Sequence, residues 1–176
     1  MHFSIEPLTS PEQLSKCATL MLGSSPWNRL YFTREQCEES LSKAEVAIIG
    51  AVSSGGRVLG FLASMENGIG FEPLIEYVCV DELLRGGEIG TKLIDHFENV
   101  LFPSADNMYL FVSDINPKAA RLYIRLGYLP VGALADFNLE MQTEFLFRKS
   151  RRPRQAARML EAREQQDGVG PASALS

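Results

Sequence analysis

Residues 81–91, DELLRGGEIGT, form a glycine-rich turn between two apolar segments. The segment before the turn, PLIEYVCV at residues 73–80, is almost continuously apolar, which is typical of a central strand buried on both faces. After the turn, apolar residues recur at helical spacing from about residue 89 to residue 101. A strand, a glycine turn and a helix start together expose backbone N–H groups and the positive end of a helix dipole, which favour an anion. Alone, this pattern indicates an anion site no more strongly than a simple change of chain direction.

The rest of the chain up to residue 150 shows strand and helix patterns of ordinary length. Capping residues mark two early helix starts, one at Thr9-Ser10-Pro11 and one at Thr33 with Gln36 three positions later. Alternation and turn signals predict strands at 2–8, 44–52, 57–65, 108–114, 128–134 and 143–149, helices from 11 to near 23, from 34 to about 41 and from 117 to about 126, and a break at 66–70. This order predicts one mixed α/β sheet with helices on both faces.

Composition is that of a globular protein with one domain. The chain has 176 residues, of which 45% are hydrophobic and 22% charged, enough for one buried core. It contains no apolar run of the length that spans a bilayer, and its N-terminus lacks a secretory signal pattern, so we expect a cytoplasmic protein. Three cysteines without a CxxC pair, together with only two histidines, indicate neither a disulfide framework nor a metal site.

Charge is distributed unevenly along the chain. The net charge is −5, but residues 148–176 carry seven basic and three acidic side chains, which leaves −9 on residues 1–147. An acidic body favours a cationic substrate over nucleic acid. We expect a folded domain at residues 1–150 and a basic, partly disordered tail at residues 151–176, which could contact an anionic partner or the acidic body itself.

A second motif gives the glycine turn a specific interpretation. NPKAARLYIRLGY, residues 116–128, begins at a helix start and ends at a glycine stop. Residues 85–90 resemble the R/Q-x-x-G-x-G/A motif of the GNAT superfamily, the Gcn5-related N-acetyltransferases, and residues 116–128 match its N-x-x-A-x-x-x-Y-x-x-x-G-F/Y pattern at every spaced position. The expected order of elements from residue 3 to residue 150 resembles that family as well. The resemblance implies a GNAT-like acyl-CoA N-acyltransferase fold, with a mostly antiparallel mixed sheet of about seven strands.

The same resemblance implies a binding site for acetyl-CoA, a co-substrate that needs no metal. The strand before the turn would lend backbone groups to the acetyl carbonyl and the pantetheine arm. Amides of the turn would hold the pyrophosphate with an arginine nearby, and the asparagine of the second motif would bond the pantetheine. The implied binding residues are Tyr77, Val78, Cys79, Val80, Arg85, Gly86, Gly87, Glu88, Ile89, Gly90, Thr91 and Asn116.

Glu88 departs from the family pattern, which normally has glycine at that position. We expect a negative φ at Glu88, with its side chain turned outward and its amide still facing the phosphate, while Gly87 adopts the unusual backbone conformation instead. A negative charge near the helix start suits the helix dipole but competes with the pyrophosphate for the same field.

By the same resemblance, Tyr123 would protonate the departing thiolate of coenzyme A. Direct transfer to an amine needs such an acid, and a tyrosine with a pKa of about 10 stays protonated at neutral pH. The alternative is a core aromatic on the helix that begins near Asn116. We favour the catalytic role because Asn116 and the glycine turn accompany Tyr123.

Glu76 is our candidate for the general base. Some family members carry a glutamate five residues before the asparagine, where this chain has Phe111. A carboxylate in an otherwise apolar strand is costly unless it is exposed, paired or functional, and partial burial would raise its pKa. A structural salt bridge is an equally good interpretation of Glu76. Asp81, Glu82 and Asp114 are weaker candidates, more typical of caps and turns.

An aromatic cluster around Trp27, Tyr31 and Phe32 lies in the loop between the first two helices, a region that lines the acceptor site in relatives. Such residues more commonly pack beneath a loop.

The resemblance implies an N-acetyltransferase that moves the acetyl group of acetyl-CoA directly to an amine in a ternary complex. The acceptor would be a small molecule or a protein N-terminus, and the protein could form a homodimer. One alternative is a non-catalytic acyl-CoA-binding sensor or interaction module. A second alternative, a nucleotide-binding α/β domain, lacks its required fingerprints, since neither a P-loop nor G-x-G-x-x-G is present.

Overall fold

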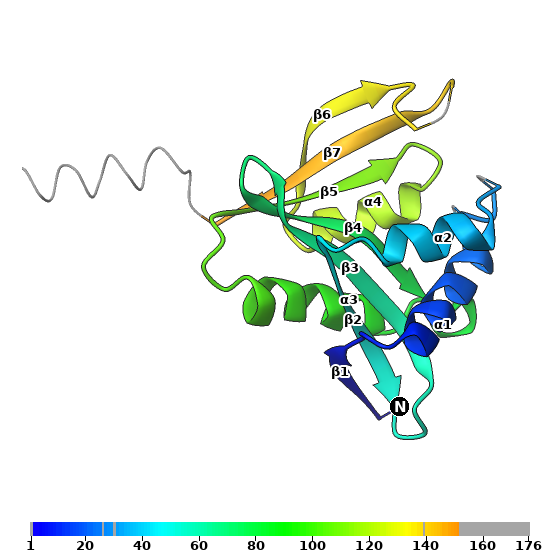
Figure 1. The fold of residues 1–176 in the computed structure, drawn as a ribbon. Helices are drawn as coiled ribbons and strands as arrows, with labels where there is room; N and C mark the ends of the chain where they lie inside the picture. Colours follow the sequence, from blue (N-terminus) through cyan, green and yellow to red (C-terminus); the bar gives the residue numbers. More distant parts are fainter. Residues whose placement is uncertain (1, 26, 30, 139, 152–176) are drawn as a thin grey trace, which may run out of the picture.

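A computed structural model describes residues 2–25, 27–29, 31–138 and 140–151, which fold around one seven-stranded mixed sheet (Figure 1). The strand order is β1-β2-β3-β4-β5-β7-β6, and every neighbouring pair is antiparallel except β4 and β5. The strands are β1 Phe3–Pro7, β2 Val46–Ser53, β3 Val58–Ile69, β4 Glu72–Val80, β5 Asn107–Ser113, β6 Leu129–Ala135 and β7 Thr143–Ser150. The expected mixed, mostly antiparallel sheet is therefore confirmed.

Helices cover both faces of this sheet (Figure 1). The helices are α1 Pro11–Leu22, α2 Arg34–Leu41, α3 Ile89–His96 and α4 Pro117–Arg125, with short helices η1 Glu82–Leu84 and η2 Phe97–Leu101. Both early helices begin with a complete capping box, formed by Ser10 with Gln13 and by Thr33 with Gln36. None of the helices in the described ranges has the length and apolar content to cross a membrane.

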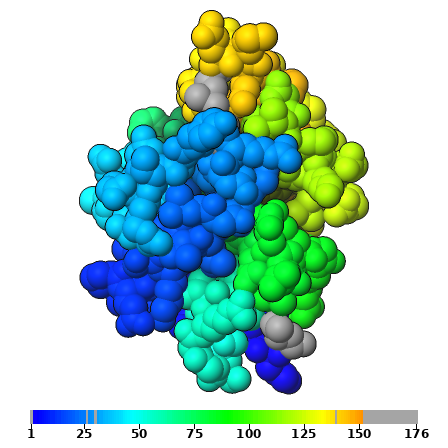
Figure 2. Space-filling model, turned by 90° about the vertical axis from the view of Figure 1, so that its right-hand side faces the viewer, coloured from blue at the N-terminus to red at the C-terminus, as the bar shows by residue number. Residues whose placement is uncertain are grey.

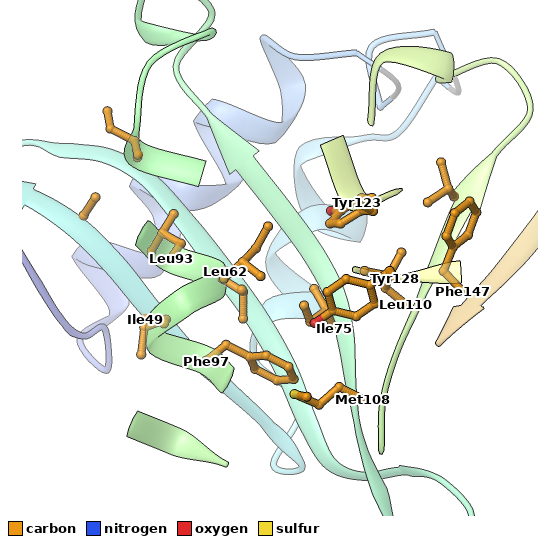
Figure 3. Packing of buried hydrophobic residues seen from close by; sticks show 14 of the residues in the cluster. Ile49, Leu62, Ile75, Leu93, Phe97, Met108, Leu110, Tyr123, Tyr128 and Phe147 are labelled. Carbon is orange, nitrogen blue, oxygen red and sulfur yellow. The ribbon is translucent and has the colours of Figure 1, made fainter. Parts of the chain in front are cut away.

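Each face of the sheet has its own hydrophobic core. On one face α1 and α2 bury Met21, Trp27 and Phe61 among other apolar residues. On the other face α3 and α4 pack over a cluster that includes Phe97 and Tyr123 (Figure 3). β4 contributes side chains to both cores, as expected for a central strand.

The helix expected from about residue 89 to residue 101 changes form partway along. α3 ends at His96, and residues 97–101 continue as a π-helix, in which Phe102 N–H donates to Phe97 O at 3.0 Å. Both Phe97 and Glu98 are buried there, and Glu98 forms an ion pair with Lys149 of β7. The expected helix is therefore confirmed over its whole length, and its change to π-helical form accompanies an ion pair with a residue distant in sequence.

The expected break at residues 66–70 is mostly strand. β3 runs on to Ile69, and the chain reverses at Gly70 and Phe71, which both have positive φ. Gly68 lies so close to β4 that a Cβ atom on it would sit 2.1 Å from Leu74 Cβ. Glycine is therefore needed here for strand contact, although in sequence it resembles a turn signal.

β4 and β5 pair only over a short distance and then separate. Their parallel ladder contains two pairs, Leu74 with Tyr109 and Ile75 with Leu110. On its other edge β4 continues to pair with β3, but the register shifts where Ala63 faces Tyr77 and Ser64 faces Ile75. Glu76 is therefore the extra residue of a β-bulge, a feature often found beside functional sites.

The end of β7 is tied to the end of η2 by Arg151. Its backbone N–H donates to Asp106 O at 2.8 Å, and its guanidinium donates to Glu98 O at 2.7 Å and Pro103 O at 2.8 Å. The expected tail from residue 151 onward lies, apart from Arg151, outside the described residues.

Candidate active site

A cavity of about 590 Å³ lies where β4 and β5 separate. It brings together Glu76, Tyr77 and Val78 of β4 with Asn116 and Tyr123 of α4. The other lining residues are Ser25, Trp27, Phe32, Met65, Gly68, Ile69, Leu74, Ile75, Leu110, Phe111, Val112, Ser113, Ala119, Phe137, Asn138 and Glu144. Segments far apart in sequence thus surround it: Figure 2 shows the blue α1–α2 region against the yellow-green β5–α4 region, with the yellow β6–β7 end above.

Tyr123 enters the cavity from the buried side of α4. Its side chain is 8% exposed, and its ring lies edge-on to Tyr128 with the ring centroids 5.9 Å apart (Figure 3). Burial raises the pKa of Tyr123 above its usual range. The phenol is therefore protonated at neutral pH, which is the state that a proton donor needs.

Glu76 lines the same cavity from the bulge in β4. It is half-buried and has no hydrogen-bond or ion-pair partner among the described residues. Burial raises the pKa of Glu76, Lys43 offsets part of this rise, and Glu45 adds to it. No cation of the described residues lies within ion-pair distance of Glu76, although Lys43 attracts its carboxylate from farther away. A carboxylate with a raised pKa can act as a proton acceptor.

The three weaker carboxylate candidates have structural partners. Asp81 forms an ion pair with Arg57 and accepts a hydrogen bond from Leu83 N–H at 3.0 Å. Glu82 lies 3.3 Å from the Arg85 guanidinium. Asp114 accepts from a backbone N–H of β7 at 3.2 Å. Caps and turns account for these three residues.

The glycine turn connects η1 to α3 beyond the end of β4. Gly86 has φ +81°, whereas Gly87 is not among the residues with positive φ. The unusual backbone conformation expected at Gly87 is therefore adopted by Gly86. Within the described residues, nothing accepts a hydrogen bond from the backbone N–H groups of residues 86–91. A Cβ atom on Gly86 would meet nothing within 4 Å. The turn thus offers free amides and open space, which fit a diphosphate.

Glu88 has φ −89°, as expected, and stands at the N-cap of α3 without a side-chain cap hydrogen bond. Its carboxylate forms an exposed ion pair with Lys92 at 3.1 Å. The side chain therefore turns away along the helix while the amide stays free. Arg85, which we expected near the phosphate, donates from Nε to Val80 O at 3.1 Å.

Asn116 caps the N-terminus of α4. Its side-chain oxygen accepts a hydrogen bond from Ala119 N–H at 3.3 Å, and the residue also lines the cavity. Oriented in this way, the amide group uses its oxygen for the helix and leaves its NH₂ as a donor.

The remaining β4 residues differ in position. Tyr77 lines the cavity and lies edge-on to Trp27 with the ring centroids 6.1 Å apart. Cys79 and Val80 lie farther along the strand, outside the cavity lining. Burial raises the pKa of Cys79 to about 11 and that of Cys17 to about 12, so both thiols are protonated at neutral pH.

Two residues of the cavity wall were not identified from the sequence. Phe137, after β6, stacks on Phe111 with the ring centroids 5.6 Å apart. Glu144 of β7 also lines the cavity and is only 6% exposed. Burial raises the pKa of Glu144, hydrogen bonds with Asn138 and Ser113 partly offset the rise, and Asp114 adds to it. A carboxylate that shares a strand face with Leu146 was the signal that could have identified Glu144.

Metal ligands do not gather in the described part of the chain, where no group of three or more His, Cys, Asp or Glu side chains could hold an ion.

Comparison with known sequences gives one family. The model of the acetyltransferase (GNAT) family matches residues 12–128. No curated protein matches the chain.

Solved structures share the fold at low sequence identity. An aminoglycoside 6'-N-acetyltransferase complexed with coenzyme A is 19% identical, with 86% of this chain and 98% of that chain covered and a TM-score of 0.68. The ribosomal-protein-S18-alanine N-acetyltransferase from Escherichia coli is 14% identical, with 85% of this chain and 94% of that chain covered and a TM-score of 0.70. Arabidopsis thaliana NAA60 in complex with a bisubstrate analogue is 18% identical, with 86% of this chain and 100% of that chain covered and a TM-score of 0.68.

Proposed function

Since the chain belongs to the acetyltransferase (GNAT) family, we propose that it transfers the acetyl group of acetyl-CoA to the primary amine of a small cationic acceptor. The observation that carries the proposal is the cavity that Glu76 and Tyr123 line together. One side chain can accept a proton and the other can donate one, as aminolysis of a thioester requires. Among the described lining residues there is no lysine, arginine or histidine, which favours a cationic acceptor.

The residues present fit acetyl-CoA. The free amides of residues 86–91 would hold the pyrophosphate at the start of α3. Asn116 would donate its side-chain NH₂ to the pantetheine arm. β4 has no pairing with β5 beyond Ile75, so that backbone groups of Tyr77 and Val78 on this edge would bond the arm and the acetyl carbonyl. A structural neighbour at 19% identity is complexed with coenzyme A, which supports the expectation.

The proposed reaction is a direct transfer. Glu76 takes one proton from the acceptor ammonium group, through water where the two groups do not touch, and passes it to solvent. The amine nitrogen then forms a bond to the thioester carbon, and the C–S bond breaks. Tyr123 gives its proton to the departing sulfur and is reprotonated as the nitrogen loses its second proton. The products are an N-acetylated amine and coenzyme A with a free thiol.

The test is an assay of thiol release from acetyl-CoA by the purified protein across a panel of small amines, with mass spectrometry of the acetylated product. We expect release that depends on both the amine and the protein. Tight binding of acetyl-CoA by calorimetry, with no thiol released for any amine in the panel, would instead support the non-catalytic sensor.

A further inference from the structure

We infer that the acceptor carries two ammonium groups, and that Glu144 binds the one that does not react. This inference rests on the proposed function, because Glu76 is then occupied with the reacting amine. The proposed acceptor in the cavity is a small aliphatic diamine or an amine of the same shape and charge. It assigns to Glu144 a role in acceptor selection and not in proton transfer.

The position of Glu144 is the first observation. Glu144 belongs to β7, which lies between β5 and β6 in the sheet. It faces Ser113 of β5 and Leu134 of β6 and lines the cavity. Only 6% of the surface of Glu144 is exposed. Residues that face each other in an antiparallel pair project to the same side of the sheet. Glu144 therefore shares its side of the sheet with Ser113, which also lines the cavity.

The charge of the cavity is the second observation. Glu76 and Glu144 are its two carboxylates, and none of its described lining residues is basic. Asn138 and Ser113 offer Glu144 hydrogen bonds but no opposite charge. A buried carboxylate without a cation is costly. A dication in the cavity would neutralise both groups, whereas an acceptor with a carboxylate of its own would be repelled.

The aromatic wall is the third observation. Phe111 and Phe137 stack on each other beside the cavity, and both belong to its lining. Aromatic faces attract ammonium groups and also pack against methylene chains. An aliphatic diamine presents both kinds of surface.

The sheet geometry sets the length of the acceptor. Ile75 pairs with Leu110, and Glu144 pairs with Ser113 two strands away from β4. With about 3.3 Å per residue and about 4.8 Å between paired strands, the Cα atoms of Glu76 and Glu144 would lie on the order of 12 Å apart. Because β4 and β5 separate beyond Ile75, the actual distance is at least this large. An acceptor that reaches both carboxylates therefore needs a chain of several methylene groups.

The experiment compares cadaverine with aminopentanol, in which a hydroxyl replaces one amino group. In the wild-type protein we expect kcat/KM for cadaverine to exceed that for aminopentanol by at least about tenfold, the scale of one charge-assisted contact. In Glu144→Gln this ratio should fall to about one. Glu140→Gln, which makes the same charge change at an exposed position before β7, should keep the wild-type ratio.

A second variant measures reach. Glu144→Asp keeps the charge but retracts it by one methylene, so the preferred diamine should lengthen from cadaverine to hexamethylenediamine. Unfolding curves for every variant identify loss of the fold. The comparison of cadaverine with aminopentanol in the wild-type protein does not depend on the folding of any variant.

Equal kcat/KM for cadaverine and aminopentanol in the wild-type protein would overturn the inference while the proposed function stood. An unchanged ratio in Glu144→Gln would overturn it as well, and so would a single-ammonium peptide acetylated as fast as cadaverine. If neither small amine is acetylated, the proposed function fails for this class. Calorimetry then decides the inference on its own: cadaverine should bind the coenzyme A-loaded wild-type protein more tightly than aminopentanol, and Glu144→Gln should not discriminate.

Discussion

Tyr123 and Glu76 line one cavity although they come from different layers of the protein, Tyr123 from a helix and Glu76 from the sheet. Both residues reach the cavity because β4 and β5 stop pairing after Ile75, which opens the sheet between these strands. The proposed proton acceptor and proton donor would therefore approach one reacting group from two layers of the protein.

Replacement of Tyr123 by phenylalanine tests the proposed acid. We expect Tyr123→Phe to lower kcat by roughly 10²-fold, with little change in KM for acetyl-CoA. The neighbouring Tyr128 provides a matched control, because its ring is buried edge-on to that of Tyr123 but the residue lies outside the cavity lining. Tyr128→Phe should keep kcat near the wild-type value. Equal kinetics in wild type and Tyr123→Phe would remove Tyr123 from the chemistry.

The dependence of rate on pH tests the proposed base. Glu76 must be ionised to accept a proton, and burial raises its pKa, so kcat/KM should rise with pH through that raised pKa. Glu76→Gln should abolish this step and leave only the titration of the acceptor amine, with kcat/KM lower by roughly 10²-fold at neutral pH. The measurement is a pH–rate profile with one amine. A mutant profile that keeps the same inflection would mean that another group titrates.

Asn116 combines two roles that a pair of substitutions can separate. Asn116→Asp keeps an oxygen that accepts from Ala119 N–H, so stability should change little, but it loses the NH₂ donor and should weaken acetyl-CoA binding. Asn116→Ala loses the cap as well and should cost about 1 kcal/mol of stability. Calorimetry with acetyl-CoA and urea denaturation provide the two readouts. Undiminished affinity in Asn116→Asp would show that the amide does not contact the pantetheine.

Glu88 places a carboxylate beside the proposed pyrophosphate site. Its removal in Glu88→Gly or Glu88→Gln should leave the Kd for acetyl-CoA level or tighten it by up to about fivefold, since a solvent-exposed charge pair is worth about 1 kcal/mol or less. Any gain should shrink at high salt. A large loss of affinity would instead mean that the ion pair with Lys92 at 3.1 Å holds the turn in shape.

Glu144 should reduce stability at neutral pH. Its pKa is raised in the folded protein, so the folded state binds more protons than the unfolded state between the unfolded and the folded pKa. Stability therefore falls as pH rises through this window. Glu144→Gln removes the penalty and should raise the melting temperature at neutral pH, with no gain below about pH 4, where the carboxyl is protonated in both states. A gain that is equal at all pH values would contradict this account.

Local signals in the sequence predicted most of the elements. The capping residues at Thr33 and Gln36, the hairpin signal at residues 53–56 and the Asn116 cap each act within a few residues, and the structure has all three. The glycine turn was also predicted, but the choice of Gly87 over Gly86 was wrong because two adjacent glycines carry no signal that distinguishes them.

Features that depend on distant residues were missed. The π-helical end of α3 accompanies the pairing of Glu98 with Lys149, which lie 51 positions apart. The extension of β3 depends on contact between Gly68 and Leu74. A continuously apolar β4 gave no alternation from which the bulge at Glu76 could be predicted, and the cavity position of Glu144 depends on strand pairing that brings β7 beside β5.

The bulge in β4 also makes Glu76 a removable residue. Ile75 and Tyr77 face neighbouring positions on β3, so a chain that lacked Glu76 would have a regular β3–β4 register from Gly60 to Met65. Insertion or deletion of a single codon could therefore add or remove the proposed base while the rest of the strand kept its place. In an alignment with relatives, a gap of one residue at this position would separate chains that carry the carboxylate from chains that do not.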